Sequence, residues 1–317
     1  MIAIPIEKAD KIILDFKDDI DSYKTEILDK LVSFRVTLAD SQLAYVDLLI
    51  EFIRDLDGLR AKKKIISQKK AEFDNIYNKA NTSLKEWKSF KDSLIYRLGY
   101  SDRRGDFYPK YFKKIGIKSC VFCNSQLCVT VSSKKNELIA KFQVDHYLNK
   151  SEYPCFSVSL FNLYPVCASC NLKKGIHKID FDLYVDSKDI KKSNYSFQLE
   201  DIDASVAKYL LDRKSENLSI KFIEPTPPIG HKSFNEVFSI EGIYETQKDL
   251  AEELILKAEI YTKSYKETLV KSFKEIFSNT NITNRIIIGN YAEENEIHNR
   301  PMAKFTQDIA KQLGLLD

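Results

Sequence analysis

The sequence predicts an α+β fold that is mainly α-helical. Apolar residues recur at steps of three and four from residue 8 to about 97 and again from 244 to 277. Between these helical regions lie short β-branched runs bounded by turn residues, which indicate strands. The chain has 317 residues, of which 44% are hydrophobic and 30% are charged. This length and composition predict a folded protein of two or three domains.

We expect residues 1–100 to form a coiled-coil-like helical arm. Its seam is heptad-like and runs through two segments (Ile13, Phe16, Ile20, Tyr23, Ile27 and Phe34; then Tyr45, Leu49, Phe52, Leu56 and Leu59). A third helix is expected near 83–98, with Leu84, Trp87, Phe90 and Leu94 facing inward. Such an arm can pair with itself or with another chain. The lysine-rich stretch "RAKKKIISQKK" fits a solvated helical face, or else a patch that contacts a nucleic-acid backbone.

The segment "GYSDRRGDFYP" at 99–109 ends the arm, because it concentrates glycine, proline and polar turn residues. The runs "LCVTVSS" and "LIAKFQVDH" predict strands within a second domain at 101–185. The third region, 186–317, is expected to be mixed at first and helical afterwards. Within it, "NRIIIGNYA" at 284–292 predicts a short extended piece, and a final helix closes the chain.

Charge and hydropathy exclude some classes of protein. The net charge is only +3, so any nucleic-acid site must be a local patch. No apolar run approaches the roughly 20 residues that span a bilayer. The start of the chain lacks the basic region and small-residue cleavage site of a secretion signal, so we expect a cytoplasmic protein. In a reducing compartment, six cysteines indicate metal binding rather than disulfides.

Four of the cysteines form two C-x-x-C pairs, "CVFC" and "CASC". Zinc takes four ligands at tetrahedral angles, and two such pairs supply them. We therefore predict a structural zinc site made of Cys120, Cys123, Cys167 and Cys170. Cys128 and Cys155 have no matching partner at this spacing, and we expect them to be small buried residues.

Polar residues that can carry chemistry lie between and just after the cysteine pairs. Asp145 and His146 are adjacent at the end of a predicted strand, where their side chains point to opposite faces unless the chain turns. Asn162 precedes the second pair and Asn171 follows it directly. The simpler alternatives are a hydrogen-bonded structural histidine, a turn-capping Asn162, and an Asn171 that bonds the amides of a helix N-terminus.

The residues "DH" at 145–146, "NL" at 162–163, "CASCNLKKG" at 167–175 and "CVFC" at 120–123 resemble the HNH endonucleases, also called ββα-metal nucleases. The resemblance is to the zinc-stapled four-cysteine branch and covers about 117–180. It implies a small ββα-metal core between the helical arm and a helical C-terminal region. It also implies that His146 is the general base, that Asp145 and Asn171 bind a catalytic divalent ion, and that Asn162 orients the base.

The chemistry of phosphodiester hydrolysis fits these roles. A hard cation with few protein ligands neutralises developing charge and leaves room for the phosphate, which favours Mg²⁺ or Mn²⁺. A histidine can take a proton from water at neutral pH. The neighbouring Lys173, Lys174 and Lys178 are predicted to contact phosphates of the nucleic acid. His177 is expected on the solvent-exposed surface, with a spare ligand or phosphate contact as the alternative.

Together, these expectations describe a metal-dependent DNA endonuclease. It is expected to nick one strand of duplex DNA or to cut both, with little sequence preference. The C-terminal stretch "NYAEENEIHNRPMAKFTQDIAKQLGLL" resembles the ends of bacterial HNH proteins of anti-phage defence, including Septu-like and retron-linked nucleases. That resemblance implies an ABC- or SMC-like ATPase, or another defence protein, as a partner. The large helical fraction around a small nuclease suggests that the enzyme is held inactive until a partner or an infection signal arrives. The alternative is a zinc-stapled module that binds nucleic acid or protein without cutting.

Overall fold

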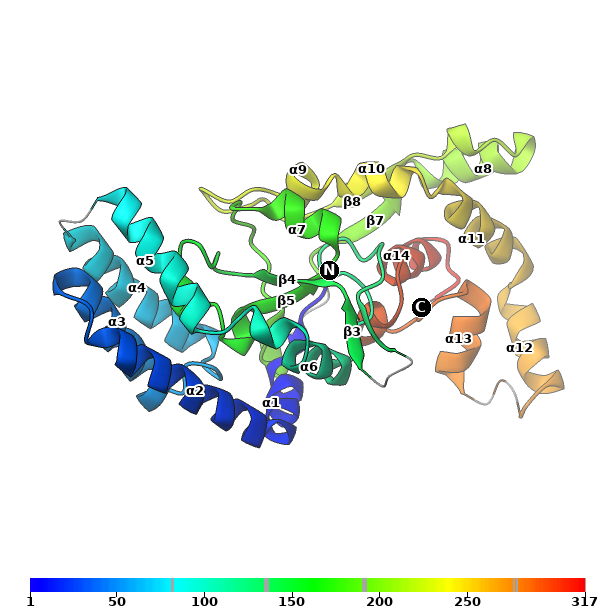
Figure 1. Cartoon of the computed structure of the whole chain (residues 1–317). Coiled ribbons are helices and arrows are strands. Elements are labelled where there is room, and N and C mark those ends of the chain that lie inside the picture. The colour runs from blue at the N-terminus through cyan, green and yellow to red at the C-terminus, as the bar shows by residue number, and fades with distance from the viewer. Residues whose placement is uncertain (81–82, 134–136, 190–192, 276, 278, 317) are drawn as a thin grey trace. The chain divides into compact units, whose positions relative to one another are not determined.

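The computed structural model describes residues 1–80, 83–133, 137–189, 193–275, 277 and 279–316 (Figure 1). The chain divides into two compact units, and each is built from several stretches of sequence. Unit 1 consists of Met1–Pro5, Gly116–Val129 and Val166–Asp317, and unit 2 consists of Ile6–Ile115 and Thr130–Pro165. The expected α+β, mainly helical class is confirmed. The division into segments 1–100, 101–185 and 186–317 stays a prediction.

Unit 2 holds the helices of the N-terminal region and the strands around the Asp145–His146 pair. Its helices are α1 (Ile6–Asp15), α2 (Lys17–Arg35), α3 (Asp40–Asp55), α4 (Lys63–Lys79), α5 (Leu84–Arg97) and α6 (Phe107–Ile115). Its strands are β2 (Val129–Ser132), β3 (Leu138–Lys141), β4 (Gln143–His146) and β5 (Leu163–Val166). The first residue of β2, Val129, and the last residue of β5, Val166, are assigned to unit 1. β2 pairs with β3, and β4 pairs with β5.

Helices α2 to α5 pack side by side (Figure 1). Their facing side chains form an aromatic core. The Tyr45 ring lies 4.6 Å from Phe73 and 5.7 Å from Phe90 between ring centroids. Phe156, from the loop after β4, contacts both Phe52 and Phe73 at 5.4 and 5.7 Å. Large aromatic side chains contribute much of the burial energy of a core. The helices and this loop therefore share one core, so the loop's position depends on the helices.

The helix near residues 83–98 differs from the expectation at one residue. Trp87, Phe90 and Leu94 are buried as expected, but Leu84 is 80% exposed. Ser83 caps α5 and forms a reciprocal capping box with Glu86. Leu84 is therefore the first helical residue, on a turn that extends beyond the packed part of the helix.

Unit 1 holds the four paired cysteines and the C-terminal helices. Its strands are β1 (Ile4–Pro5), β6 (Tyr184–Val185), β7 (Ser196–Leu199) and β8 (Ile220–Ile223). Its helices are α7 (Ala168–Lys174), α8 (Ile202–Asp212), α9 (Phe234–Phe238), α10 (Ile240–Glu245), α11 (Lys248–Ile260), α12 (Lys263–Ser272), α13 (Thr280–Ile288) and α14 (Ala303–Gln312). β1 runs parallel to β6, while β7 and β8 are antiparallel with Ser196 opposite Ile223.

Helix α14 packs on β7, and its side chains form hydrogen bonds with backbone groups of β7 that do not pair with another strand in the described part of the chain. The amide of Phe197 donates to Asp308 Oδ2 at 2.9 Å. Gln312 accepts from the amide of Leu199 at 2.8 Å and donates to its carbonyl at 3.0 Å. Backbone groups at a buried strand edge need such partners. The final helix therefore completes a two-stranded sheet that has no third strand there among the described residues.

The expected extended piece at 284–292 is wrong, because α13 covers its first half. The side chain of Asn279 accepts from the amide of Ile282 and starts the helix, while Gly289 ends it at a φ of +79°. The run of isoleucines suggested a strand, but the capping residues on both sides favour a helix.

A search of the described residues for a helix with the length and apolar character of a membrane span finds none.

Candidate metal centre and predicted site residues

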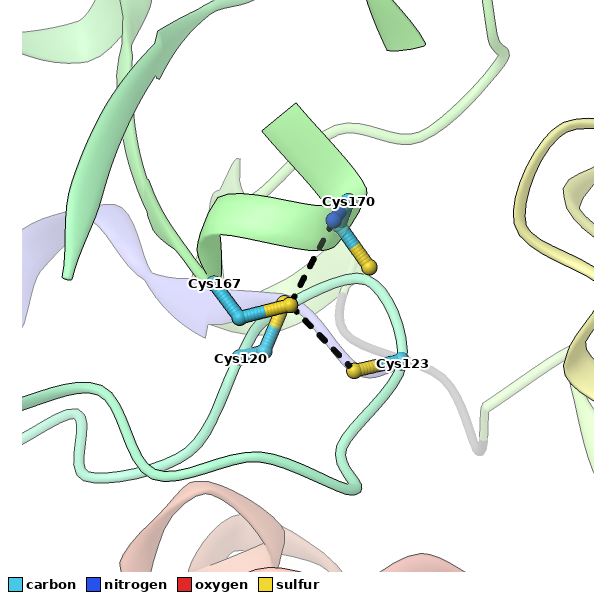
Figure 2. Close-up of side chains that lie close together, drawn as sticks. All are labelled: Cys120, Cys123, Cys167 and Cys170. Atoms are coloured by element: carbon cyan, nitrogen blue, oxygen red, sulfur yellow. Dashed lines mark hydrogen bonds between the residues drawn. The ribbon is translucent and has the colours of Figure 1, made fainter. Parts of the chain in front are cut away.

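The two cysteine pairs meet within unit 1 (Figure 2). Their four Sγ atoms all lie within 4.8 Å of one another, and the Sγ atoms of Cys123 and Cys167 are 4.0 Å apart. All four residues are buried. Figure 2 shows the sulfurs pointing toward a common centre from the start of α7 and from the loop that holds Cys120 and Cys123.

Local hydrogen bonds shape the first cysteine turn. The amide of Asn124 donates to the carbonyl of Cys120 at 2.9 Å, which closes the turn. Asn124 has a φ of +53°, a conformation that asparagine tolerates better than most residues. Its side chain donates to Ser119 Oγ and to the carbonyl of Ile297 at 2.7 and 3.0 Å. These hydrogen bonds fix the turn from both sides.

The second pair is shaped by the helix it begins. Cys167 is the N-cap of α7, and its sulfur accepts from the amide of Cys170 at 3.4 Å. Ser125 donates its hydroxyl to the sulfur of Cys123 at 3.2 Å. Hydrogen bonds of this kind stabilise thiolates and fix the direction of each ligand.

These donors fit a zinc ion. A tetrahedral ion with Zn–S bonds of about 2.3 Å places the sulfurs about 3.8 Å apart, close to the spacing seen here. Burial raises the pKa of Cys120, while hydrogen bonds from neighbouring thiols, first from Cys120, lower the pKa of Cys123. Closely packed thiolates need a cation to balance their charge. The four cysteines can therefore hold zinc, which would tie the two segments together.

The other two cysteines match the expectation of small buried residues. Cys128 is 1% exposed and Cys155 is fully buried. Neither belongs to the sulfur cluster found among the described residues. Burial raises the pKa of Cys155 to about 12, which keeps it a neutral thiol.

Asp145 and His146 lie on β4 in unit 2 and are almost completely buried. The Nε2 atom of His146 lies 3.0 Å from the carbonyl oxygen of Ser157. The imidazole also meets the ring of Tyr100 at 4.8 Å between centroids. The hydroxyl of Tyr100 donates to the carbonyl of Val144 at 3.2 Å, so this one side chain contacts two residues of β4.

Asn162 holds the loop that follows β4. Its Nδ2 donates to the carbonyls of Phe156 and Leu148 at 2.9 and 3.2 Å. Its Oδ1 accepts from the amide of Leu148 at 2.8 Å, and its own carbonyl accepts from the amide of Tyr147. Asn162 is only 1% exposed, and its side chain forms hydrogen bonds with the backbone on both sides of the loop that leads to Ser157.

The remaining predicted site residues belong to unit 1. Asn171 lies on α7, and Lys173 and Lys178 are exposed, as is His177. Lys174 is only 2% exposed, which makes it a poor surface contact for a phosphate. The structure thus brings Asp145, His146 and Asn162 into one unit, and Asn171 and the lysines into the other.

Sequence reasoning did not identify Tyr100 or Ser157 as neighbours of His146. Tyr100 belongs to a turn-rich segment whose composition gives no sign of a contact with β4. Ser157 contacts His146 only through its backbone carbonyl, which every residue type has, so the sequence cannot reveal the contact.

The fold and the cysteines define a mainly helical α+β protein with a candidate four-cysteine zinc centre. A curated protein from Bacillus thuringiensis, described as Septu protein PtuB, is 30% identical over 124 residues. That match covers 37% of this chain and 44% of the relative, so the chain spans less than half the length of the curated relative it matches. No family model matches the chain, and no solved structure matches it.

Proposed function

We propose that the chain is a metal-dependent HNH endonuclease that hydrolyses phosphodiester bonds of DNA. The observation that carries the proposal is the contact between His146 Nε2 and the carbonyl of Ser157. A carbonyl oxygen only accepts, so Nε2 bears a proton, and the neutral imidazole then carries its lone pair on Nδ1. This tautomer is the form that can take a proton from a water molecule.

The loop around His146 supports the same role. Asn162 bonds the backbone at Leu148 and Phe156, and Phe156 directly precedes the residue whose carbonyl meets the imidazole. Asn162 is therefore a positioning residue in this proposal: it fixes the carbonyl that fixes the ring. Tyr100 covers the ring from another side.

The proposed catalytic ion is Mg²⁺ or Mn²⁺, with the carboxylate of Asp145 in unit 2 as its proposed ligand. Asn171 of unit 1 stays a second ligand that the sequence predicts. Such an ion, when bound, neutralises charge on the phosphate. Lys173 and Lys178 would contact neighbouring phosphates from the exposed surface of unit 1. Zinc at the cysteines has the separate task of holding α7 and the Cys120–Cys123 turn together.

We further propose that the enzyme acts in anti-phage defence with a partner protein. The similarity to the protein described as Septu protein PtuB supports this proposal. An ABC- or SMC-like ATPase is the partner we propose, with the partner raising a low basal activity. Strong killing of cells by the chain expressed alone would count against this form of restraint.

Plasmid nicking tests the proposal. Protein with its zinc content verified is assayed without added divalent ion, with Mg²⁺, and with Mn²⁺. We expect ion-dependent nicking that falls by a factor of about 10²–10⁴ in His146→Ala. His177→Ala, which removes an exposed histidine, is the matched control and should nick normally. Equal nicking by His146→Ala would remove the proposed base, and DNA binding without any nicking would favour the non-catalytic binding module.

A further inference from the structure

Unit 2 contains a cavity of about 470 Å³ beside β4. One wall comes from the segment before and within α6, and the other from β3 and β4. Among the residues that line it are Ser101, Arg104, Tyr108, Ala140, Phe142 and Val144. Its volume lies within the range of about 300–1,000 Å³ that is usual for small-molecule sites.

The cavity is linked to His146 through one strand and one side chain. Val144 lines the cavity and lies two residues before His146, so both side chains project from the same face of β4. Two residues along a strand span about 7 Å. Tyr100 donates to the carbonyl of Val144 and packs its ring on His146. A group in the cavity would therefore lie about 7 Å from His146, the proposed general base, which is close to the spacing of one nucleotide.

The chemistry of the walls is apolar, with positive charge at the edge. Ala140, Phe142 and Val144 present apolar surface. The exposed Arg104 lines the cavity, and the ammonium of the half-buried Lys150 lies over the Tyr100 ring at 4.6 Å. Neither cation forms an ion pair with a carboxylate of the described residues. Burial lowers the pKa of Lys150, and the positive charge of Arg104 lowers it further.

From these observations we propose that the cavity holds one unpaired nucleobase of a DNA substrate, with Arg104 and Lys150 contacting its phosphates. A base has flat apolar faces that suit the strand wall, and guanidinium groups stack on bases or pair with phosphates. A paired and stacked base cannot enter a cavity of this kind. The inference rests on the proposed function, and it adds that the substrate is single-stranded or opened beside the cleaved bond.

Binding of a short single-stranded oligonucleotide that contains 2-aminopurine tests the inference without requiring cleavage. The zinc-loaded full chain is titrated without added Mg²⁺ or Mn²⁺, and the same oligonucleotide annealed to its complement is the comparison. We expect the probe to be quenched on binding and the single strand to bind about tenfold more tightly than the duplex. Equal affinity for the two forms would overturn the inference.

Two variants locate the effect. Ala140→Trp fills the cavity and should weaken single-strand binding about tenfold while leaving duplex binding unchanged. Val131→Trp adds the same bulk at a partly exposed position on the neighbouring β2, outside the cavity, and is the matched control. Arg104→Gln, at an exposed position that leaves folding intact, should weaken binding and reduce its salt dependence by about one counterion. Single-strand affinity that is unchanged in either Ala140→Trp or Arg104→Gln would overturn the inference.

The outcomes also separate this inference from the proposed function. Selective single-strand binding without any nicking would contradict the nuclease proposal and support the cavity. Nicking that depends on His146 without a preference for unpaired bases would support the nuclease proposal and overturn the cavity.

Discussion

The cysteine cluster of unit 1 and the His146 strand of unit 2 are built in different ways. The cluster arises from two local turns, each of which places two sulfurs by a gap of two residues. The orientation of His146 instead depends on the Ser157 carbonyl and the Tyr100 ring, which come from other segments of the chain. The spacing of cysteines in the sequence can therefore predict a metal site, whereas the orientation of one imidazole depends on packing between distant segments.

The two regions also differ in what holds them. In unit 1, four sulfurs lie close enough together to bind one metal ion. In unit 2, the side-chain amide of Asn162 holds the loop after β4 through hydrogen bonds to its backbone. A structural zinc ion stabilises its site far more than a few hydrogen bonds stabilise theirs. Loss of a ligand in unit 1 should therefore have the larger effect.

The largest expected effect is that of Cys167→Ala. The variant should lose its zinc and several kcal/mol of stability, on the order of 5, because metal binding and local folding are coupled. Zinc content by mass spectrometry and thermal unfolding followed by circular dichroism check this expectation. A shift of about 10–20 °C in the first unfolding transition corresponds to that loss.

Cys128→Ala provides the matched control, since it removes a buried cysteine outside the cluster. It should retain full zinc content and lose only about 1 kcal/mol, which is typical of a point substitution. A Cys167→Ala protein with full zinc content would show that the four sulfurs are not the metal site.

A smaller effect is expected from Asn162→Ala in unit 2. The substitution leaves the amide of Leu148 and the carbonyls of Leu148 and Phe156 without their present partner. Unsatisfied buried groups cost about 1–3 kcal/mol each, and partial solvation reduces the sum to about 2–4 kcal/mol. Urea unfolding measures the change, and zinc content should stay constant.

Asn149→Ala tests whether the effect is specific to Asn162. Asn149 bonds the amide and hydroxyl of Ser151 in an exposed part of the same loop. The variant should lose less than about 1 kcal/mol, because the affected groups reach water. Equal losses in the two variants would mean that the loop is not held by Asn162 in particular.

The smallest expected effect concerns the start of α5. Hydrogen bonds from Ser83 lower the pKa of Glu86. A lowered folded-state pKa stabilises the protein above the unfolded value of 4.5, and this stabilisation is lost as pH falls through the folded value. Ser83→Ala should cost about 1 kcal/mol at neutral pH, and the difference from the parent protein should shrink on acidification below about pH 4. A difference that is constant from pH 7 to pH 3 would contradict this account.

The sequence predicted the features that depend on neighbouring residues. Helical periodicity indicated that the N-terminal region is helical, although the structure divides it into separate helices, α1 to α5. The two C-x-x-C gaps indicated a cluster that the structure assembles from Cys120, Cys123, Cys167 and Cys170. It failed where several local signals competed, as at 284–292, where caps at Asn279 and Gly289 outweigh the isoleucine run. The shared core of Phe52, Phe73 and Phe156 was also out of reach, because no periodic pattern links a loop to distant helices.

The most direct test of the central claim measures zinc content and Mg²⁺-dependent nicking on the same preparations of the parent chain and of His146→Ala. The account predicts about one zinc ion per chain in both proteins and nicking by the parent chain alone. Nicking by His146→Ala at the parental rate, with its zinc in place, would contradict the claim that a fixed imidazole in unit 2 does the chemistry while the sulfurs of unit 1 hold the scaffold.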